Sequence, residues 1–414
     1  MLDIKFIRQH IDKVRQSIAD RGINVDIDEL LGLDEKRRTL IVKIDEGRAI
    51  RNKKSEGKPS EEEIKKMRVL GDEISATEKE LKDLEIYYLE LLKKVPNLVH
   101  PDTPRGGEES FKVLEESGKK PQFKFEPKDH ESLMLGLDLI DFERGAKVSG
   151  AKFYFAKNNL VRLNQALMNY GIDIVTKHGF TLIETPDIAK NEVLSGIGFN
   201  PRGEAEDQIY TIEKTDLGLI ATAEITMGGY HADEILNLSK GPLKYAALSH
   251  CFRKEAGAYG RESKGLYRVH QFTKLEMFVY CKAEDSETMH EEILKIEKEL
   301  VRGLELPYRV IDIASGDLGS PAYRKYDIEA WMTMRNDYGE ITSTSNCTDY
   351  QARRLNIRYR KDNGETEFVH TLNGTAIVSS RFPIAILENY QTEAGTIKIP
   401  EALQKYMGGL KEIK

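Results

Sequence analysis

The feature that most constrains this fold is an apolar repeat with alternating gaps of three and four residues. It runs over four heptads within the first hundred positions: Met67, Leu70, Ile74, Thr77, Leu81, Leu84, Tyr88, Leu91 and Val95. This spacing places every member on one face of a helix and is typical of a coiled-coil seam. We therefore expect a long helix here that packs against a second helix.

The preceding stretch provides the second helix. A weaker apolar pattern lies on one side of it, interrupted at Gly47: Leu30, Leu33, Leu40 and Ile44. Residues 53–60, KKSEGKPS, have the composition of a turn, and Ser60 with Glu63 matches a capping box. We therefore expect an antiparallel coiled coil over about residues 27–95.

Helix ends and proline- and glycine-rich stretches predict the domain organisation. Residues 1–24 have the spacing of one short amphipathic helix, and Pro96 ends the long helix. A linker rich in proline and glycine follows it. We expect a helical arm over 1–100, a linker and lead-in segment over 101–130, and a second domain over 131–414.

Bulk composition excludes several classes of protein. The 414 residues carry a net charge of −7, which argues against a general nucleic-acid coat but permits local basic patches. No apolar run approaches the ~20 residues that span a bilayer, and the N-terminus resembles neither a signal nor a transit peptide. A cytoplasmic protein is the expectation. The cysteines, Cys251, Cys281 and Cys347, form neither a disulfide framework nor a zinc motif, and we expect buried thiols.

Charge on the arm is uneven. Between positions 48 and 68 four acidic residues stand against eight basic ones: Arg48, Arg51, Lys53, Lys54, Lys58, Lys65, Lys66 and Arg68. Such a run is commonly the solvated face of a coiled coil. A basic end on an arm is also suited to gripping RNA phosphates. The residues alone leave both readings open.

Two β-rich runs between Leu248 and Cys281 flank a loop that contains Gly257, Gly260, Gly265 and the charges of RESK. On a strand, Arg253 and Glu255 share one face, as do Phe272 and Glu276. An arginine–carboxylate pair beside a glycine-rich loop can bind a phosphate and a base. The alternatives are that Arg253 and Glu255 form only a surface ion pair on a hairpin, and that Phe272 is only a core residue.

The wording FRKEAGAYGRESKGLYRVHQFTKLE resembles motif 2 of the class II aminoacyl-tRNA synthetases, in particular the seryl-tRNA synthetase family in its bacterial or organellar form. FTLIETPDI, with Pro186, resembles motif 1, whose proline lies at a dimer interface. HTLNGTAIVSSRFPIAILENYQTEAGTIKIPEAL resembles motif 3. The resemblance implies an α+β fold: an N-terminal antiparallel coiled-coil arm, then a catalytic domain on a mostly antiparallel β-sheet.

The resemblance also implies an activity. Such an enzyme activates L-serine with ATP and Mg²⁺, then transfers serine to tRNA(Ser), and by the same analogy to tRNA(Sec). It acts as a homodimer, and its arm reaches the long variable arm of the tRNA. No zinc is expected, because the cysteine-rich set of the zinc-dependent forms is missing. Catalysis rests on positioning and on cations around the phosphates, without a side-chain nucleophile.

Family roles carry over to matching positions. Arg253 would hold the α-phosphate and the substrate carboxylate, Glu255 the adenine amino group, and Arg381 the γ-phosphate. Phe272 would stack on adenine, and Glu340 with Ser343 would hold Mg²⁺. The whole expected ATP-binding set is Arg253, Lys254, Glu255, Val269, Phe272, Glu340, Ile341, Thr342, Ser343 and Arg381.

Serine requires polar partners for its small hydroxyl, because a pocket that merely fits serine does not exclude alanine strongly. The expected serine-binding set is Thr222, Ala223, Glu224, Arg253, Glu276, Asn373 and Thr375. The chain departs from the frequent bacterial wording at Ser379 and Ser380, before Arg381, which affects the expected placement of that arginine. Thr342 replaces a family serine and keeps the hydroxyl.

Two other functions remain compatible with these motifs. A synthetase-like paralogue activates serine but passes it to a carrier protein, whereas a non-catalytic relative only binds RNA. The presence of Arg253, Glu340 and Arg381 disfavours the second. Assays of pyrophosphate exchange and tRNA charging distinguish all three.

Overall fold

A computed structural model describes residues 1–53, 60–198, 208–255 and 265–414. The loop glycines Gly257 and Gly260, the RESK charges, and two arm residues, Lys54 and Lys58, lie outside these ranges. The chain divides into two compact units, Met1–Leu98 and Val99–Lys414.

The first unit consists of helices in the described ranges: α1 (Ile4–Gln9), α2 (Ile11–Asp20), α3 (Ile27–Lys53) and α4 (Glu61–Lys94). The expectation of a single helix over 1–24 is wrong, because the chain breaks at His10. His10 has φ −132° and ψ 40°, and its ring lies 4.7 Å from that of Phe6. The apolar spacing continues across this break, so periodicity alone does not reveal it.

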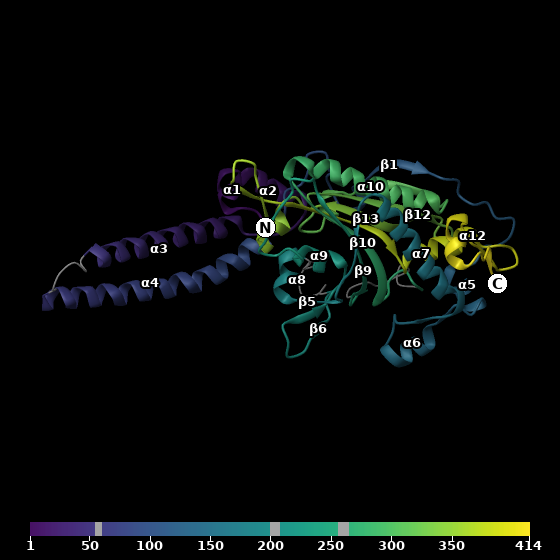
Figure 1. The fold of residues 1–414 in the computed structure, drawn as a ribbon, viewed down its shortest axis with the longest axis horizontal. Helices are drawn as coiled ribbons and strands as arrows, with labels where there is room; N and C mark the ends of the chain where they lie inside the picture. Colours follow the sequence, from purple (N-terminus) through teal and green to yellow (C-terminus); the bar gives the residue numbers. More distant parts are fainter. Residues whose placement is uncertain (54–59, 199–207, 256–264) are drawn as a thin grey trace. The chain divides into compact units, whose positions relative to one another are not determined.

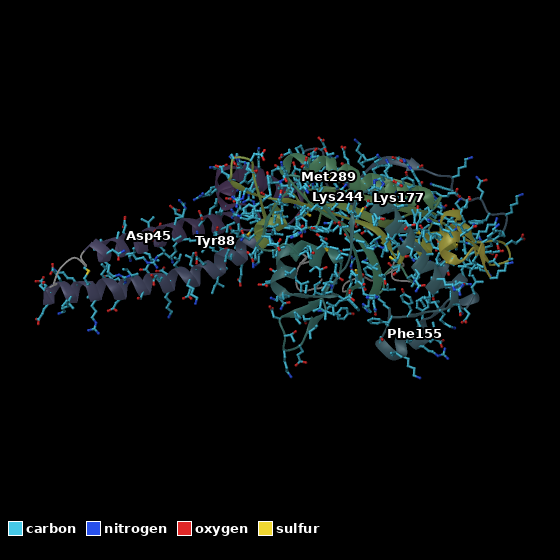
Figure 2. All side chains as sticks on the ribbon, viewed as in Figure 1. Asp45, Tyr88, Phe155, Lys177, Lys244 and Met289 are labelled. Atoms are coloured by element: carbon cyan, nitrogen blue, oxygen red, sulfur yellow. The ribbon has the colours of Figure 1, made fainter. Side chains whose placement is uncertain are left out.

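Helices α3 and α4 run side by side as the expected antiparallel pair (Figure 1). Six seam residues are buried: Ile74, Thr77, Leu84, Tyr88, Leu91 and, just after α4, Val95. Tyr88 lies between the helices with the Arg37 guanidinium 5.5 Å from its ring centroid (Figure 2). The coiled-coil expectation is confirmed.

Gly47 does not interrupt α3, which continues through it. A Cβ atom at Gly47 would lie 2.9 Å from Cγ1 of Ile74 on α4. The missing side chain therefore allows the two helices to approach closely. The capping box is confirmed, because the Ser60 side chain accepts from the Glu63 backbone and Glu63 accepts from the Ser60 backbone.

The second unit is built on an eight-stranded sheet in the described ranges. The strands in spatial order are β1 (Lys112–Ser117), β11 (Tyr308–Asp312), β12 (Arg324–Met332), β13 (Asp337–Asn346), β16 (His370–Val378), β10 (Gln271–Cys281), β9 (Leu243–Phe252) and β4 (Thr181–Glu184). Every pairing is antiparallel except that of β4 with β9. The mostly antiparallel sheet is confirmed. Its edge strand β1 comes from the segment expected as a linker.

Helices and small strand groups surround this sheet (Figure 1). The helices are α5 (His130–Gly136), α6 (Phe142–Ser149), α7 (Asn158–Lys177), α8 (Asn191–Ile197), α9 (Ala223–Gly229), α10 (Ser286–Gly303), α11 (Tyr350–Leu355), α12 (Arg381–Tyr390) and α13 (Glu401–Gln404). The small groups are β2 (Ile140–Asp141) with β3 (Phe155–Ala156), β5 (Ile188–Lys190) with β6 (Thr211–Ile212) and β7 (Leu217–Leu219), β8 (Ile235–Leu236) with β14 (Arg358–Arg360) and β15 (Thr366–Phe368), and β17 (Ile397–Lys398) with β18 (Glu412–Ile413).

Strand β10 separates two parts of the core by the alternation of its side chains. Leu275, Met277 and Val279 belong to a cluster with residues of α7 and α10. Phe278 and Tyr280 face the other way, into a second cluster with residues of α8, α9 and α11. Phe272, Lys274 and Glu276 lie on the same face of β10 as Phe278 and Tyr280. On this face two charged side chains and an aromatic ring therefore lie next to apolar core residues.

The three cysteines are free and buried, as expected. None of the helices in the described ranges combines the length and apolar character that crossing a bilayer requires.

Candidate active site

One cavity of the second unit collects most of the expected ATP-binding residues. It is lined by Arg253, Glu255, Tyr267, Val269, Phe272, Lys274, Glu340, Ile341, Ser343, Thr375, Val378, Ser380 and Arg381. Two members of the expected set, Lys254 and Thr342, are not among its lining residues. Residues from three separate motifs of the sequence therefore meet at one place.

The expectation that Arg253 and Glu255 lie on a strand is wrong. Strand β9 ends at Phe252, and Glu255 adopts a left-handed φ of 48°. Gln208 accepts from the backbone N–H of Lys254 through its carbonyl and from that of Glu255 through its side chain. Contacts with a distant segment thus turn the chain out of the sheet, and both side chains still reach the cavity.

A β-bulge places Glu340 and Ser343 on one face of β13. In a regular strand, residues three apart point to opposite faces. Here Glu340 pairs with Glu329, whereas Thr342 pairs with the adjacent Ile328, so Ile341 is an extra residue. The bulge shifts the alternation, and it also explains why Thr342 is buried away from the cavity.

Strand β16 contains a matching irregularity. Thr375 pairs with Glu276 and Ile377 with Leu275, which leaves Ala376 as the extra residue. Thr375 and Val378, again three apart, both line the cavity. The two bulges thus bring side chains of β13 and β16 to the same side of the sheet.

Glu340 and Arg381 form an ion pair in the cavity lining. Their closest oxygen and nitrogen atoms are 2.9 Å apart, and the Arg381 guanidinium also donates to the Glu340 carbonyl at 3.3 Å. Burial raises the pKa of Glu340, but the cations Arg381, Lys325 and Arg253 together outweigh it, and the pKa falls to about 2. The carboxylate is therefore ionised at neutral pH.

The expected adenine contacts are held by cationic neighbours. The Arg253 guanidinium lies 5.2 Å from the ring centroid of Phe272, within the range of a cation–π contact. Arg253 also donates to the Ala221 carbonyl at 3.3 Å, and Arg268 pairs with Glu255 at 3.4 Å. Phe272 presents its ring to the cavity, although it also belongs to the core.

Tyr267 is a cavity residue that sequence reasoning missed. Its ring lies 5.0 Å from the guanidinium of Arg381 and 4.0 Å from that of Arg335. It thereby supports the arginine that begins α12. Lys274, Val378 and Ser380 were missed as well. For Lys274 the period-2 spacing between Phe272 and Glu276 was an available signal.

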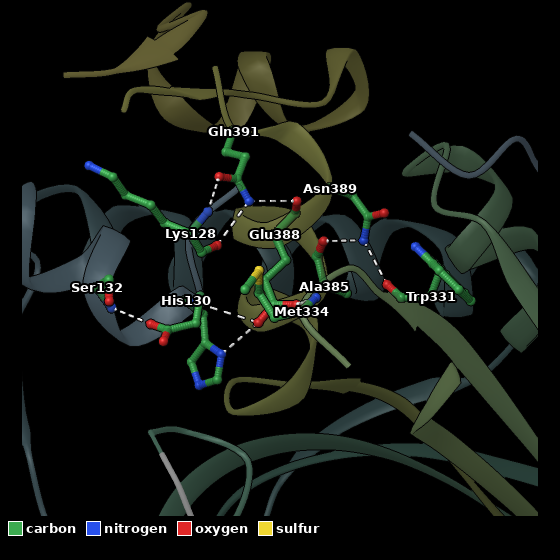
Figure 3. A network of polar contacts seen from close by, with 10 residues as sticks. Lys128, His130, Ser132, Trp331, Met334, Ala385, Glu388, Asn389 and Gln391 are labelled. Carbon is green, nitrogen blue, oxygen red and sulfur yellow. Dashed lines mark hydrogen bonds and ion pairs between the residues drawn. The ribbon is translucent and has the colours of Figure 1, made fainter. Parts of the chain in front are cut away.

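A buried carboxylate anchors α12, the helix that Arg381 begins (Figure 3). Glu388 accepts from Nδ1 of His130 at 2.8 Å, in the tautomer with a proton there, and from the backbone N–H of Met334 at 3.1 Å. Asn389 donates to the carbonyl of Trp331 at 2.7 Å. Hydrogen bonds from segments distant in sequence therefore hold this helix in place.

Two of the expected serine-binding residues, Arg253 and Thr375, line the cavity, and the others are not among its lining residues. Lys274 and Glu276 form an ion pair at 2.5 Å, and the hydroxyl of Thr375 donates to Glu276 at 3.3 Å. Asn373, two positions before Thr375 on β16, is also buried. Thr375 and Lys274 line the cavity, so this group borders the ATP-binding residues.

Glu224 approaches this group from α9. Thr222 caps the helix by accepting from the Glu224 backbone, and Ala223 is fully buried. Burial raises the pKa of Glu224 to about 7, with a further contribution from the negative charge of Glu276. Two carboxylates thus lie near one another, which favours a cationic ligand group between them.

The expected RNA-binding residues of the arm belong to the first unit. Arg48, Arg51, Lys65, Lys66 and Arg68 are exposed. Two of them form ion pairs at 2.8 Å: Arg48 with Glu78, and Lys66 with Glu62. Lys53 ends α3, and its side chain is outside the described part.

Comparison with known families matches both units. Residues 1–99 match the seryl-tRNA synthetase N-terminal domain. Residues 209–390 match the class II tRNA synthetase core domain of the G, H, P, S and T enzymes.

Relatives that align over the full length of the chain belong to the same family as the two matched domains. A serine–tRNA ligase from Treponema denticola is 54% identical over 99% of both chains. One from Dictyoglomus turgidum is 52% identical over 100% of this chain and 99% of its own. The crystal structure of seryl-tRNA synthetase from Pyrococcus horikoshii complexed with ATP superposes with a TM-score of 0.92, at 40% identity, over 100% of this chain and 99% of that one. The chain therefore belongs to the seryl-tRNA synthetase family, as a serine–tRNA ligase with a class II core.

Proposed function

We propose that the cavity catalyses attack of the serine carboxylate on the α-phosphorus of ATP, with release of pyrophosphate. The seryl-adenylate would then transfer serine to the 3′-terminal ribose of tRNA, releasing AMP. One observation carries the proposal: Arg253, Arg381, Glu340 and Phe272 line the cavity that the Lys274–Glu276–Thr375 group borders. The ATP complex of the Pyrococcus horikoshii relative supports it.

Arginines would do the main catalytic work. Arg253 would hold the α-phosphate and the serine carboxylate, gaining strength as negative charge develops in the transition state. Arg381 would bind the γ-phosphate and orient the leaving pyrophosphate. Both lie beside aromatic rings, Arg253 at Phe272 and Arg381 at Tyr267, which restricts their motion before ATP arrives. Adenine would stack on Phe272 with its amino group donating to Glu255.

Magnesium fits the donor set of β13. Mg²⁺ prefers oxygen ligands and is commonly held by one or two protein groups together with substrate phosphates. The ionised Glu340 carboxylate and the Ser343 hydroxyl both line the cavity. We propose that these two residues hold the ion, which would neutralise charge on the phosphates.

Serine would bind between Glu224 and Glu276. Its ammonium group would lie near the Glu224 carboxylate, and its hydroxyl would contact Glu276 and Thr375. Thr222 and Asn373 complete the expected contacts. This arrangement would leave buried polar groups unpaired with alanine, which is the physical basis for discrimination.

Partners and location follow from the same proposal. The basic end of the arm, Arg48 to Arg68, would bind tRNA(Ser) and also tRNA(Sec), in the cytoplasm. A second copy would dock along β4, an edge strand that precedes Pro186 and leaves Leu182 44% exposed. Sedimentation equilibrium tests this homodimer, since its mass would be twice 47.1 kDa.

Amino-acid-dependent pyrophosphate exchange tests the activation step. With ATP and Mg²⁺, L-serine should support exchange far better than threonine, alanine or glycine. Equal exchange with alanine contradicts the assigned substrate. Charging of a tRNA pool then separates the carrier-protein alternative, which predicts activation of serine without aminoacyl-tRNA.

A further inference from the structure

Gln351 is a buried amide on α11 whose hydrogen bonds join three segments. The hydroxyl of Thr371 on β16 donates to its Oε1 at 2.6 Å. Its Nε2 donates to Glu224 at 2.7 Å and to the Ile197 carbonyl, the end of α8, at 3.2 Å. Gln351 and Thr371 are both 0% exposed.

These contacts allow one orientation of the amide. If the Gln351 side chain were reversed, its oxygen would lie against the Ile197 carbonyl, which only accepts, and against Glu224, which only accepts when ionised. Both hydrogens of the amide nitrogen are used in the orientation observed. The Ile197 carbonyl therefore fixes which end of Gln351 faces Glu224. The Thr371 hydroxyl, which can donate or accept, completes the hydrogen bonds of the amide by donating to Oε1.

Glu224 as a residue is of intermediate exposure, and its carboxyl group lies among protein groups. The charged groups that face it are Glu276 and Lys274 on β10 and Arg253 after β9. Burial and Glu276 raise its pKa to about 7, while the hydrogen bond from Gln351 lowers it. In the described part of the chain, Gln351 is the residue seen to donate a side-chain hydrogen bond to it, through one oxygen.

We propose that Gln351, held by Thr371 and the Ile197 carbonyl, is a positioning residue that directs the second carboxylate oxygen of Glu224 at the ammonium group of serine. This inference rests on the proposed function. Gln351 would touch neither substrate. It would set the rotamer of Glu224 and favour the ionised form that an ammonium group requires.

The predicted effect is confined to one substrate. Gln351 contacts Glu224 and is not among the residues that line the ATP cavity. Its loss should therefore weaken serine binding and leave the KM for ATP unchanged. A general loss of folding would affect both substrates, so the comparison of the two KM values separates the explanations.

Pyrophosphate exchange with the full-length protein tests this role. Gln351→Met keeps the length of the side chain but removes the amide, and it should raise the KM for serine roughly tenfold to hundredfold. Thr371→Val removes only the donor to Gln351 and should raise it about threefold to tenfold. Tyr170→Phe is the matched control, since it deletes another buried hydroxyl that donates to a carbonyl, Leu300, at 2.9 Å.

The pH profile gives a readout that a purely structural role would not move. The acidic limb of kcat/KM for serine should reflect the Glu224 pKa of about 7 in the free enzyme. Gln351→Met removes the hydrogen bond that lowers this pKa, so the limb should move to higher pH. The control Tyr170→Phe should leave the limb in place.

The outcomes distinguish the two claims. If the unmodified protein shows no serine-dependent exchange, both the proposed function and the role of Gln351 are wrong. If it exchanges with serine, but Thr371→Val and Gln351→Met keep the original KM for serine and pH profile, only the role of Gln351 is overturned. Should Gln351→Met fail to fold, Thr371→Val alone decides between these results.

Discussion

The two units of this protein use charged side chains in opposite ways. In the helical unit the charges are mostly at the surface, and the apolar seam between α3 and α4 carries the packing. In the second unit, charged groups such as Lys274 and Glu276 lie among core residues at 8% and 2% side-chain exposure. Removing a charged side chain from the helical unit changes its interaction with solvent or with a binding partner. Removing one from the second unit leaves an oppositely charged side chain buried without its ion pair.

One buried charge of the helical unit illustrates this contrast. Asp34 of α3 is buried, and it is held by Arg8 at 3.1 Å and Arg38 at 3.0 Å. These arginines keep 31% and 52% of their side chains exposed. The comparison teaches that the helical unit needs a pattern to fold, while the second unit needs specific three-dimensional neighbours.

The largest expected effect is on catalysis in the second unit. Arg253→Ala should lower kcat for serine-dependent pyrophosphate exchange by about a hundredfold to a thousandfold, or roughly 3–4 kcal/mol in barrier. The reason is the loss of a cation where transition-state charge develops. Circular dichroism of the helices should not change. An unchanged kcat would remove Arg253 from the catalytic set.

A seam substitution should break the helical unit and leave activation intact. Leu84→Ala deletes buried methyl groups between α3 and α4, and it should cost about 2–4 kcal/mol of that unit's stability. Amide hydrogen exchange in residues 61–94 should accelerate. Serine activation should persist, because the cavity belongs to the other unit. If exchange in α4 is unchanged, the seam does not carry the packing.

A third test concerns a carboxyl group in the core of the second unit. Glu297 on α10 is fully buried, and burial together with Glu276 raises its pKa well above the usual value. The folded state therefore keeps a proton that the unfolded state releases above its ordinary pKa. Stability should fall as pH rises through this window, by about 1.4 kcal/mol per pH unit from this group.

Glu297→Gln should remove this pH-dependent loss. The difference in denaturant midpoint between the variant and the original protein should grow as pH rises above the ordinary pKa of a glutamate carboxyl group. Because Glu297 packs near Gly374 on β16, glutamine of the same size is the suitable replacement. Parallel curves for the two proteins would show that Glu297 is ionised in the folded state.

The basic end of the arm gives a smaller, salt-dependent effect. Replacing Lys53, Lys54, Lys58, Lys65 and Lys66 by serine should reduce tRNA charging about tenfold at low salt, with the loss shrinking as salt rises. Serine activation and helix content should stay the same, because the seam stabilises the helices. Normal charging at low salt would mean that these lysines form only a solvated surface.

The smallest effect sharpens the contrast between pattern and contact within one unit. Gly71 on α4 has open space where a Cβ would lie, so Gly71→Ala should stabilise the helix by about 0.5–1 kcal/mol. Gly47→Ala has the same propensity gain, but its Cβ would meet Ile74 at 2.9 Å. It should therefore gain less or lose stability. Equal gains in chemical denaturation would show that the helices separate easily at this point.

Sequence reasoning predicted the helical unit well, because its information is local. Seam positions and the Ser60–Glu63 cap depend on spacing and composition within a few residues, whereas the turn expected over 53–60 lies mostly outside the described residues. The break at His10 was missed, since the apolar period continues across it. Motif resemblance placed Arg253, Phe272, Glu340 and Arg381, which the structure then brings to one cavity.

From the sequence alone one learns which residue types are present, in what order and with what period, and this was sufficient for the coiled coil and for the family. The sequence did not show which side of the sheet the site residues face. The bulges at Ile341 and Ala376 turn Ser343 and Val378 toward the cavity, against simple alternation. Gln351 likewise became meaningful only beside Glu224, which is 127 positions away. Bulges and buried hydrogen bonds depend on which strands and helices become neighbours, and a local pattern does not contain that information.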